Sequence, residues 1–301
     1  MTDESVQDIS PWELARVNAK LLGEHDIVVA GDPGAGAALI SNIVYELGFD
    51  YLDPYITTPD KEDAGQATPG QLAYYQQRLL ATAGDNRPAP DRPAAHGDLH
   101  RRFIKTHFYP EVFADVPLSA VVLLVRDPRD TIYSSYKWFS SFGGSWMPDS
   151  AEAIGQLTYD AFLDRVRIGD GEQSIPGWAR FHRSWLEAAP AFSKFVVVRF
   201  EDLKSHPVGA ITAMLAALGL VVSPDLVAQA AERSSFGSMR AREDEISAAE
   251  SEPTKDARIM RRGKVGEWRE WFETEGLAER FSDADLIATA ARFGYDMTPT
   301  G

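Results

Sequence analysis

Lys105 and His107 lie two residues apart in the segment RFIKTHFYP, residues 102–110. A strand places alternate side chains on one face, so an ammonium group and an imidazole would project together beside Phe103. Open α/β sheets bind ligands at the carboxyl ends of their strands, where this pair would lie. There His107 could move a proton and Lys105 could stabilise developing negative charge. The alternative is a structural histidine at a strand end, ahead of Pro110.

Arg126 and Ser134 form a second candidate pair. Arg126 follows the apolar run 121–125, and Ser134 falls near the first turn of the helix predicted next. A guanidinium at a strand end and a hydroxyl on the following helix could hold one phosphate between them. The alternative pairs Arg126 with Asp127 or Asp130 in a structural turn.

A basic cluster near the C-terminus comprises Arg261, Arg262 and Lys264 around Gly263, just before Trp268. Three cations around a flexible glycine could close on a phosphate. The alternative is a solvated basic loop. The cluster stands out because the chain has 30 Lys and Arg against 45 Asp and Glu, a net charge of -15.

A glycine loop follows the apolar run 27–30, with the sequence GDPGAGAAL. A strand, a glycine turn and a helix together cradle phosphates with backbone N–H groups. The spacing of Gly31 and Gly36 fits the start of a Walker A loop, which continues with Lys and Ser or Thr. Here Ala37 and Ala38 follow. The loop therefore predicts an anion cradle without a cation or a hydroxyl.

Composition limits the function classes. With 301 residues, 44% of them hydrophobic, and no cysteine, the chain can bury a core but offers no disulfide or thiol nucleophile. The acidic balance argues against nucleic-acid and membrane partners, and we expect a cytoplasmic protein without a signal peptide. His96 and His100 lie in a Pro-rich polar stretch, so we expect no metal site.

The order of elements predicts parallel βα units. We expect one domain over 1–301, with flexible substrate or lid loops at 57–100 and 240–262. Asp130 or Thr131 would cap the helix after Arg126, and Ser282 the last helix. The predicted strands are 26–30, 102–107, 121–126 and 195–200. The predicted helices are 10–22, 37–47, 130–140, 150–168, 176–188, 208–218, 224–233 and 282–293.

Five segments, taken in order, resemble elements of the cytosolic-type sulfotransferases, which use 3′-phosphoadenosine 5′-phosphosulfate (PAPS). They are KTH at 105–107, RDPRDTIYS at 126–134, FEDLK at 200–204, SSFGSM at 234–239 and RRGKVGEW at 261–268. They extend over most of the chain. The resemblance implies that family's fold, an α/β, P-loop-like three-layer sandwich with a central parallel sheet.

The resemblance also implies roles for individual residues. His107 would be the general base, and Lys105 would stabilise the bridging oxygen as adenosine 3′,5′-bisphosphate leaves. Phe236 would pack near the adenine. The other implied nucleotide contacts are Arg126 and Ser134 on the 3′-phosphate, Arg261, Arg262 and Gly263 closing over it, and Gly34, Gly36 and Ala37 in the glycine loop.

The glycine loop departs from the family pattern P-K-S-G-T-T-W. Aligned without gaps, Gly34 takes the place of the lysine, Ala37 and Ala38 take the places of both hydroxyl residues, and Leu39 replaces the tryptophan. The half that would hold the 3′-phosphate is kept, and the half that activates the sulfuryl group is stripped. We expect Gly34→Lys to raise PAPS turnover in an impaired transferase and to do nothing or harm in a repurposed site.

Three hypotheses follow. The first is sulfuryl transfer from PAPS to a hydroxyl or amine of a small molecule, a bacterial secondary metabolite. The second keeps the fold but catalyses elimination or ring closure on a sulfated or phosphorylated intermediate, which needs an anion site and His107 but no donor lysine. The third is a non-catalytic partner of an active paralogue, in a homo- or hetero-oligomer.

Overall fold

The computed structural model describes residues 19–20, 22–52, 96, 101–142, 157–164, 167–168, 171–172, 174–249, 261–270, 272 and 277–297. Most of the helix predicted at 10–22 lies outside these residues. So do the predicted loop 57–100, apart from His96, and the segment 250–260. No helix within the described ranges is long and apolar enough to cross a membrane.

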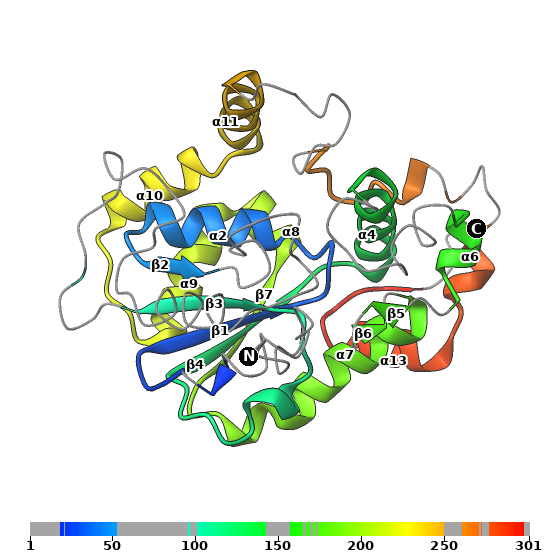
Figure 1. Cartoon of the computed structure of the whole chain (residues 1–301), viewed down its shortest axis with the longest axis horizontal. Helices are drawn as coiled ribbons and strands as arrows, with labels where there is room; N and C mark the ends of the chain where they lie inside the picture. The colour runs from blue at the N-terminus through cyan, green and yellow to red at the C-terminus, as the bar shows by residue number, and fades with distance from the viewer. Residues whose placement is uncertain are drawn as a thin grey trace, which may run out of the picture.

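A five-stranded parallel sheet forms the centre, in the order β2-β3-β1-β4-β7 (Figure 1). The strands predicted at 26–30, 102–107, 121–126 and 195–200 are confirmed to within one residue at each end. The short edge strand β2 was not predicted from the sequence. The strands are β1 Asp26–Gly31, β2 Asp50–Leu52, β3 Arg102–Thr106, β4 Ala120–Val125 and β7 Phe195–Arg199.

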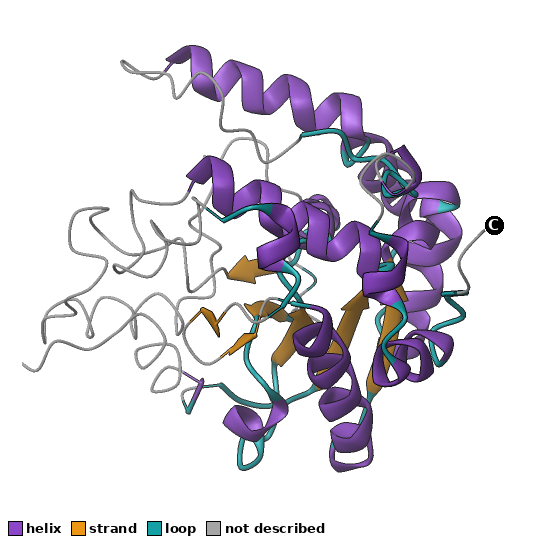
Figure 2. Cartoon of the chain, turned by 90° about the vertical axis from the view of Figure 1, so that its right-hand side faces the viewer, coloured by secondary structure: helices purple, strands orange, loops and turns teal. Residues whose placement is uncertain are grey.

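Helices cover both faces of this sheet, which confirms the three-layer α/β arrangement (Figure 2). Alternation along the strands divides the core in two: Val29 faces one side and Val28 the other. On the side of Val29 lie α2 Ala37–Glu46, α9 Pro207–Leu218 and α10 Pro224–Arg233. On the side of Val28 lie α4 Pro128–Phe142, α7 Ile175–Ala188 and α13 Ala284–Ala291.

Three expectations about helices were wrong. The helix predicted at 150–168 is described only as the short α6 Tyr159–Phe162, capped by Thr158, with β5 Arg167–Ile168 and β6 Gly171–Glu172 after it. The predicted loop from 240 begins inside α11 Phe236–Ala249, whose residues favour helix although few are apolar. Asp283, and not Ser282, caps α13 through the Leu286 N–H at 2.8 Å.

The shorter elements are α8 Phe200–Ser205 and the 3-10 turns Pro110–Phe113, Ala189–Ala191 and Ala278–Phe281. The sheet has a switch point between its central strands. After β1 the chain enters α2 on one face, and after the neighbouring β4 it enters α4 on the other. Ligands of open α/β sheets bind where adjacent strands diverge in this way.

His182, in the middle of α7, gives the folded protein a measurable dependence on pH. Its ring is fully buried beside Trp178, with Nδ1 2.8 Å from the Trp178 carbonyl oxygen. Burial lowers the pKa of His182 to about 4. Between an unfolded value near 6.5 and this folded value, the unfolded chain binds the proton and the folded chain does not, so stability falls as pH falls.

We expect this residue alone to remove about 3 kcal/mol of the free energy of unfolding between pH 7 and pH 4. Urea denaturation of the wild type and of His182→Gln at both pH values measures it. The variant should show a smaller drop between the two pH values by that amount, whereas the exposed His206→Gln should behave as the wild type does. Equal drops in all three proteins would contradict the prediction.

Candidate functional site

The glycine loop between β1 and α2 has a backbone that excludes side chains at two positions. Gly34 has φ +90° and Gly36 has φ +108°, values that favour glycine. A Cβ added to Gly34 would lie 2.4 Å from the carbonyl oxygen of Thr131 and 3.3 Å from Cβ of Ser134. A Cβ on Gly36 would lie 2.4 Å from the ring of Phe200. The loop is therefore packed directly onto α4 and α8.

This packing changes the meaning of the missing lysine. The position aligned with the family's lysine has no room for a Cβ, because the backbone of α4 occupies the space. The expectation that Gly34→Lys separates an impaired transferase from a repurposed site is therefore wrong. Any side chain at this position must move the loop or the helix. Ala37 and Ala38 begin α2 and are half-buried, with ordinary helical geometry.

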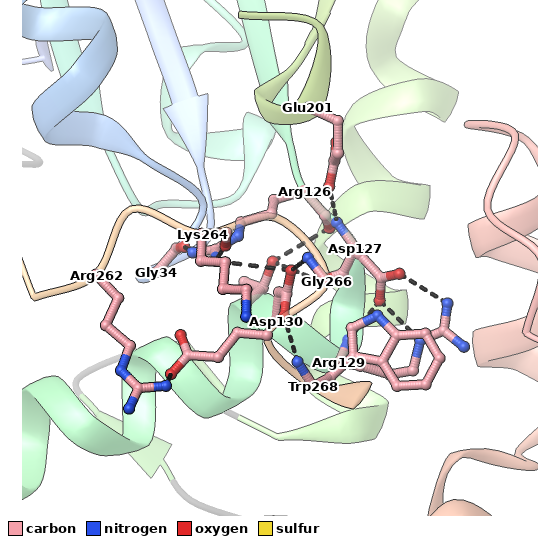
Figure 3. A network of polar contacts seen from close by, with 12 residues as sticks. Gly34, Arg126, Asp127, Arg129, Asp130, Glu201, Arg262, Lys264, Gly266 and Trp268 are labelled. Carbon is pink, nitrogen blue, oxygen red and sulfur yellow. Dashed lines mark hydrogen bonds and ion pairs between the residues drawn. The ribbon is translucent and has the colours of Figure 1, made fainter. Parts of the chain in front are cut away.

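Arg126, at the end of β4, links the glycine loop to the segment 261–266. Its guanidinium donates to the carbonyl oxygen of Gly34 at 2.9 Å and to that of Lys264 at 3.1 Å (Figure 3). It lies 4.5 Å from the centre of the Phe200 ring. The residue is only 6% exposed. Burial lowers the pKa of Arg126, opposed by the charge of Asp130.

Asp130 holds the segment that contains the basic cluster. It accepts the backbone N–H of Gly266 at 2.7 Å and that of Trp268 at 2.9 Å, and it lies 3.7 Å from the Arg126 guanidinium (Figure 3). Burial raises the pKa of Asp130, while Arg126 lowers it. The structural pairing of Arg126 with Asp130 is thus present. It leaves the guanidinium in place beside the glycine loop.

The expected cap of α4 was wrong. Neither Asp130 nor Thr131 caps the helix; the carboxylate of Asp127 accepts the Arg129 N–H at 2.9 Å. Asp127 also pairs with the Arg129 side chain at 2.7 Å. Since the helix begins at Pro128, Ser134 lies in its second turn, half-buried beside Gly34.

The cations of the basic cluster are paired within their own segment. Arg261 makes two hydrogen bonds with the buried carboxylate of Glu267, at 2.6 and 2.5 Å. Arg262 and Lys264 both contact Glu270. The cluster is therefore neither a row of solvated charges nor three cations awaiting an anion. Its charge is balanced locally, and only part of it is available to a ligand.

His107 lies just beyond β3, next to the end of β1. Its Nδ1 is 2.5 Å from the carbonyl oxygen of Gly31. A carbonyl oxygen can only accept, so Nδ1 carries the proton and Nε2 of the neutral ring keeps its lone pair. His107 and Lys105 are both partly exposed, as a base and a cation that reach a ligand must be. The alternation expected along β3 places Lys105 on the face of Phe103.

Phe236 and Gly263, far apart in the sequence, meet in the structure. A Cβ added to Gly263, whose φ is +56°, would lie 2.4 Å from the Phe236 ring. Phe236 begins α11 and is half-buried. The fold thus brings the candidate adenine contact against the segment that Arg126 also holds. Arg258 lies outside the described residues.

A network behind the site was not predicted from the sequence. Glu201 accepts the Asp127 N–H at 2.9 Å and the hydroxyl of Tyr295 at 2.6 Å. Burial and the Glu201 charge raise the pKa of Tyr295, so its phenol stays a donor. The Arg129 guanidinium lies 3.7 Å from the centre of the Trp268 ring (Figure 3). The motif FEDLK contains Glu201, but nothing in the sequence points to the distant Tyr295.

His96 has structural contacts. Its Nε2 is 2.6 Å from the Leu47 carbonyl oxygen, and its ring stacks on Phe49 at 4.2 Å. His100 lies outside the described residues.

Comparison with known proteins agrees with this geometry. Mouse sulfotransferase 2A6 is 28% identical over 54% of this chain and 55% of its own length. Mouse sulfotransferase 2A2 is 24% identical over 88% and 84%. The match to 2A6 therefore spans about half of that relative.

Two solved structures share the fold. A mouse sulfotransferase complexed with PAP has a TM-score of 0.58 at 17% identity, covering 97% of this chain and 94% of its own. Retinol dehydratase in complex with retinol and PAP has a TM-score of 0.55 at 17% identity, covering 95% and 86%. The family model described as the sulfotransferase domain matches residues 24–284. The chain therefore belongs to the sulfotransferase family.

Proposed function

We propose that this chain binds adenosine 3′,5′-bisphosphate (PAP) nucleotides and transfers a sulfuryl group from PAPS to a hydroxyl or amine of a small molecule. Membership of the sulfotransferase family supports the reaction class. Two structural neighbours were solved with PAP, which supports the nucleotide.

One observation carries the proposal: the candidate base and the candidate phosphate-binding guanidinium are both hydrogen-bonded to the same glycine loop. His107 Nδ1 contacts the Gly31 carbonyl oxygen at 2.5 Å, and Arg126 donates to the Gly34 carbonyl oxygen at 2.9 Å. A proton acceptor and an anion-binding group are thus fixed on either side of a backbone cradle. Group transfer from a nucleotide requires this juxtaposition.

The residues present fit the nucleotide unevenly. The Arg126 guanidinium has more N–H donors than its two carbonyl acceptors use, and its buried Nε has no hydrogen-bond partner among the described residues. This spare capacity suits the 3′-phosphate, with Ser134 and the Gly263 backbone nearby. The 5′ end would depend on backbone N–H groups at the start of α2 and on Lys105, because Ala37 and Ala38 carry no hydroxyl.

In this mechanism PAPS supplies a sulfuryl group activated by its phosphosulfate linkage. Nε2 of His107 takes the proton from the acceptor hydroxyl or amine, while the Gly31 carbonyl oxygen holds the ring in the correct tautomer. Lys105 offsets negative charge at the leaving oxygen. Arg126 orients the nucleotide, and Asp130 keeps the 261–266 segment folded against it.

A second function is favoured by the geometry of Gly34. Because no side chain fits there, the loop excludes a donor lysine and does not merely lack one. Elimination or ring closure on an already sulfated or phosphorylated small molecule needs His107 and an anion site, but no such lysine. One neighbour with this fold is named a dehydratase.

Isothermal titration with PAP, followed by mass spectrometry of a panel of small-molecule acceptors, tests both functions. Sulfuryl transfer predicts saturable PAP binding and an acceptor that gains a sulfate only when PAPS is present. The second function predicts release of sulfate or phosphate from a modified substrate without PAPS. A chain that neither binds PAP nor turns over any substrate in the panel would refute the proposal.

A further inference from the structure

Lys204, in α8, is a half-buried cation that takes no part in the mechanism proposed for His107, Lys105 and Arg126. Its ammonium nitrogen lies 5.6 Å from the centre of the Phe236 ring. Among the residues that the structure describes, no carboxylate lies within ion-pair distance of it. This is unusual in a chain with a net charge of -15, where carboxylates outnumber cations.

The charged group that does act on Lys204 is another cation. Burial lowers the pKa of Lys204, and the positive charge of Arg126 lowers it further. Two cations held near each other, one buried and one half-buried, repel in the ligand-free protein. An anion between or beside them would relieve this repulsion, and such like-charge pairs are typical of binding sites.

The surroundings of the pair identify the kind of anion. The Arg126 guanidinium lies over Phe200, one helical turn before Lys204 in the same helix α8 (Figure 1). Phe236 presents its ring to Lys204 on one side and to Gly263 on the other. Two aromatic rings beside two cations suit a planar base attached to a phosphorylated sugar, and not a simple inorganic anion.

We propose that Lys204 is a nucleotide-binding residue that, together with Arg126, holds the 3′-phosphate of the adenosine nucleotide. This inference rests on the proposed function and deepens it. It also accounts for the stripped glycine loop, because a second cation at the 3′ end compensates for the absence of hydroxyl side chains at the 5′ end. Nucleotide affinity in this chain therefore depends mainly on the 3′-phosphate.

The test compares PAP with adenosine 5′-monophosphate, which lacks the 3′-phosphate, by isothermal titration at fixed ionic strength. Lys204→Met keeps the stem that packs beside Phe236 and removes the charge. We expect it to weaken PAP binding about tenfold, since it removes a charge-assisted hydrogen bond, and to change 5′-monophosphate binding less than about twofold. Lys204→Arg should keep PAP affinity within about threefold.

The exposed Lys20→Met serves as the matched control and should bind both nucleotides as the wild type does. Thermal unfolding of each variant checks that the fold is intact. Unchanged PAP affinity in Lys204→Met, or an equal loss for both nucleotides, would overturn the role of Lys204 while leaving the proposed function standing. Failure of the wild type itself to bind PAP would overturn both.

Discussion

Substituting Gly34 with lysine, which brings the loop closer to the family pattern, is expected to disable the site. We expect Gly34→Lys to lower the free energy of unfolding by about 3 kcal/mol or more and to abolish nucleotide binding, because it combines a strained positive φ with a backbone clash. The clashing atom is the Thr131 carbonyl oxygen, 2.4 Å from the added Cβ. Helix α4 cannot yield without displacing Ser134 and Ser135.

Urea denaturation and PAP titration measure these effects. Gly34→Ala is the matched variant, because it adds the Cβ without the ammonium group and should be destabilised to a similar degree. Ala38→Thr restores a hydroxyl at a helical position and should cost less than about 1 kcal/mol. A folded Gly34→Lys with wild-type stability and raised PAPS turnover would show that the loop adapts, and would contradict a loop packed tightly onto α4.

Removal of the imidazole at position 107 should produce the largest loss of activity. We expect His107→Ala to lower kcat about 10²–10⁴-fold, the usual contribution of a general base, with PAP affinity changed less than about threefold. The reason is geometric: Nδ1 is anchored on the Gly31 carbonyl oxygen, so Nε2 is the atom available to an acceptor. Either candidate reaction, transfer or elimination, needs this base.

His107→Asn separates catalysis from loop positioning. Its side-chain amide can still donate to the Gly31 carbonyl oxygen, but it has no basic nitrogen in the place of Nε2. We therefore expect the Asn variant to match the wild type in stability and PAP affinity and the Ala variant in turnover. Turnover in either variant within a few-fold of the wild type would remove His107 from the mechanism. Steady-state kinetics with the acceptor identified in the panel provide the measurement.

The sequence predicted well those features that depend on local patterns. Apolar runs such as 121–125 located four strands of the sheet, because a buried parallel strand is a near-continuous apolar segment. The order of motifs placed Lys105, His107 and Arg126 at the carboxyl edge of the sheet. The two-residue periodicity along β3 put a cation and an imidazole at one strand end, which the structure retains.

Only the tertiary structure decided what these residues contact. Whether Gly34 could hold a side chain depended on α4, about a hundred residues away in the chain. The basic cluster was neutralised by Glu267 and Glu270 once the segment folded back on Asp130. Lys204 acquired Arg126 as its charged neighbour in the same way. Composition and spacing identify the charges, but their energies depend on distance and burial, which arise only when remote segments pack together.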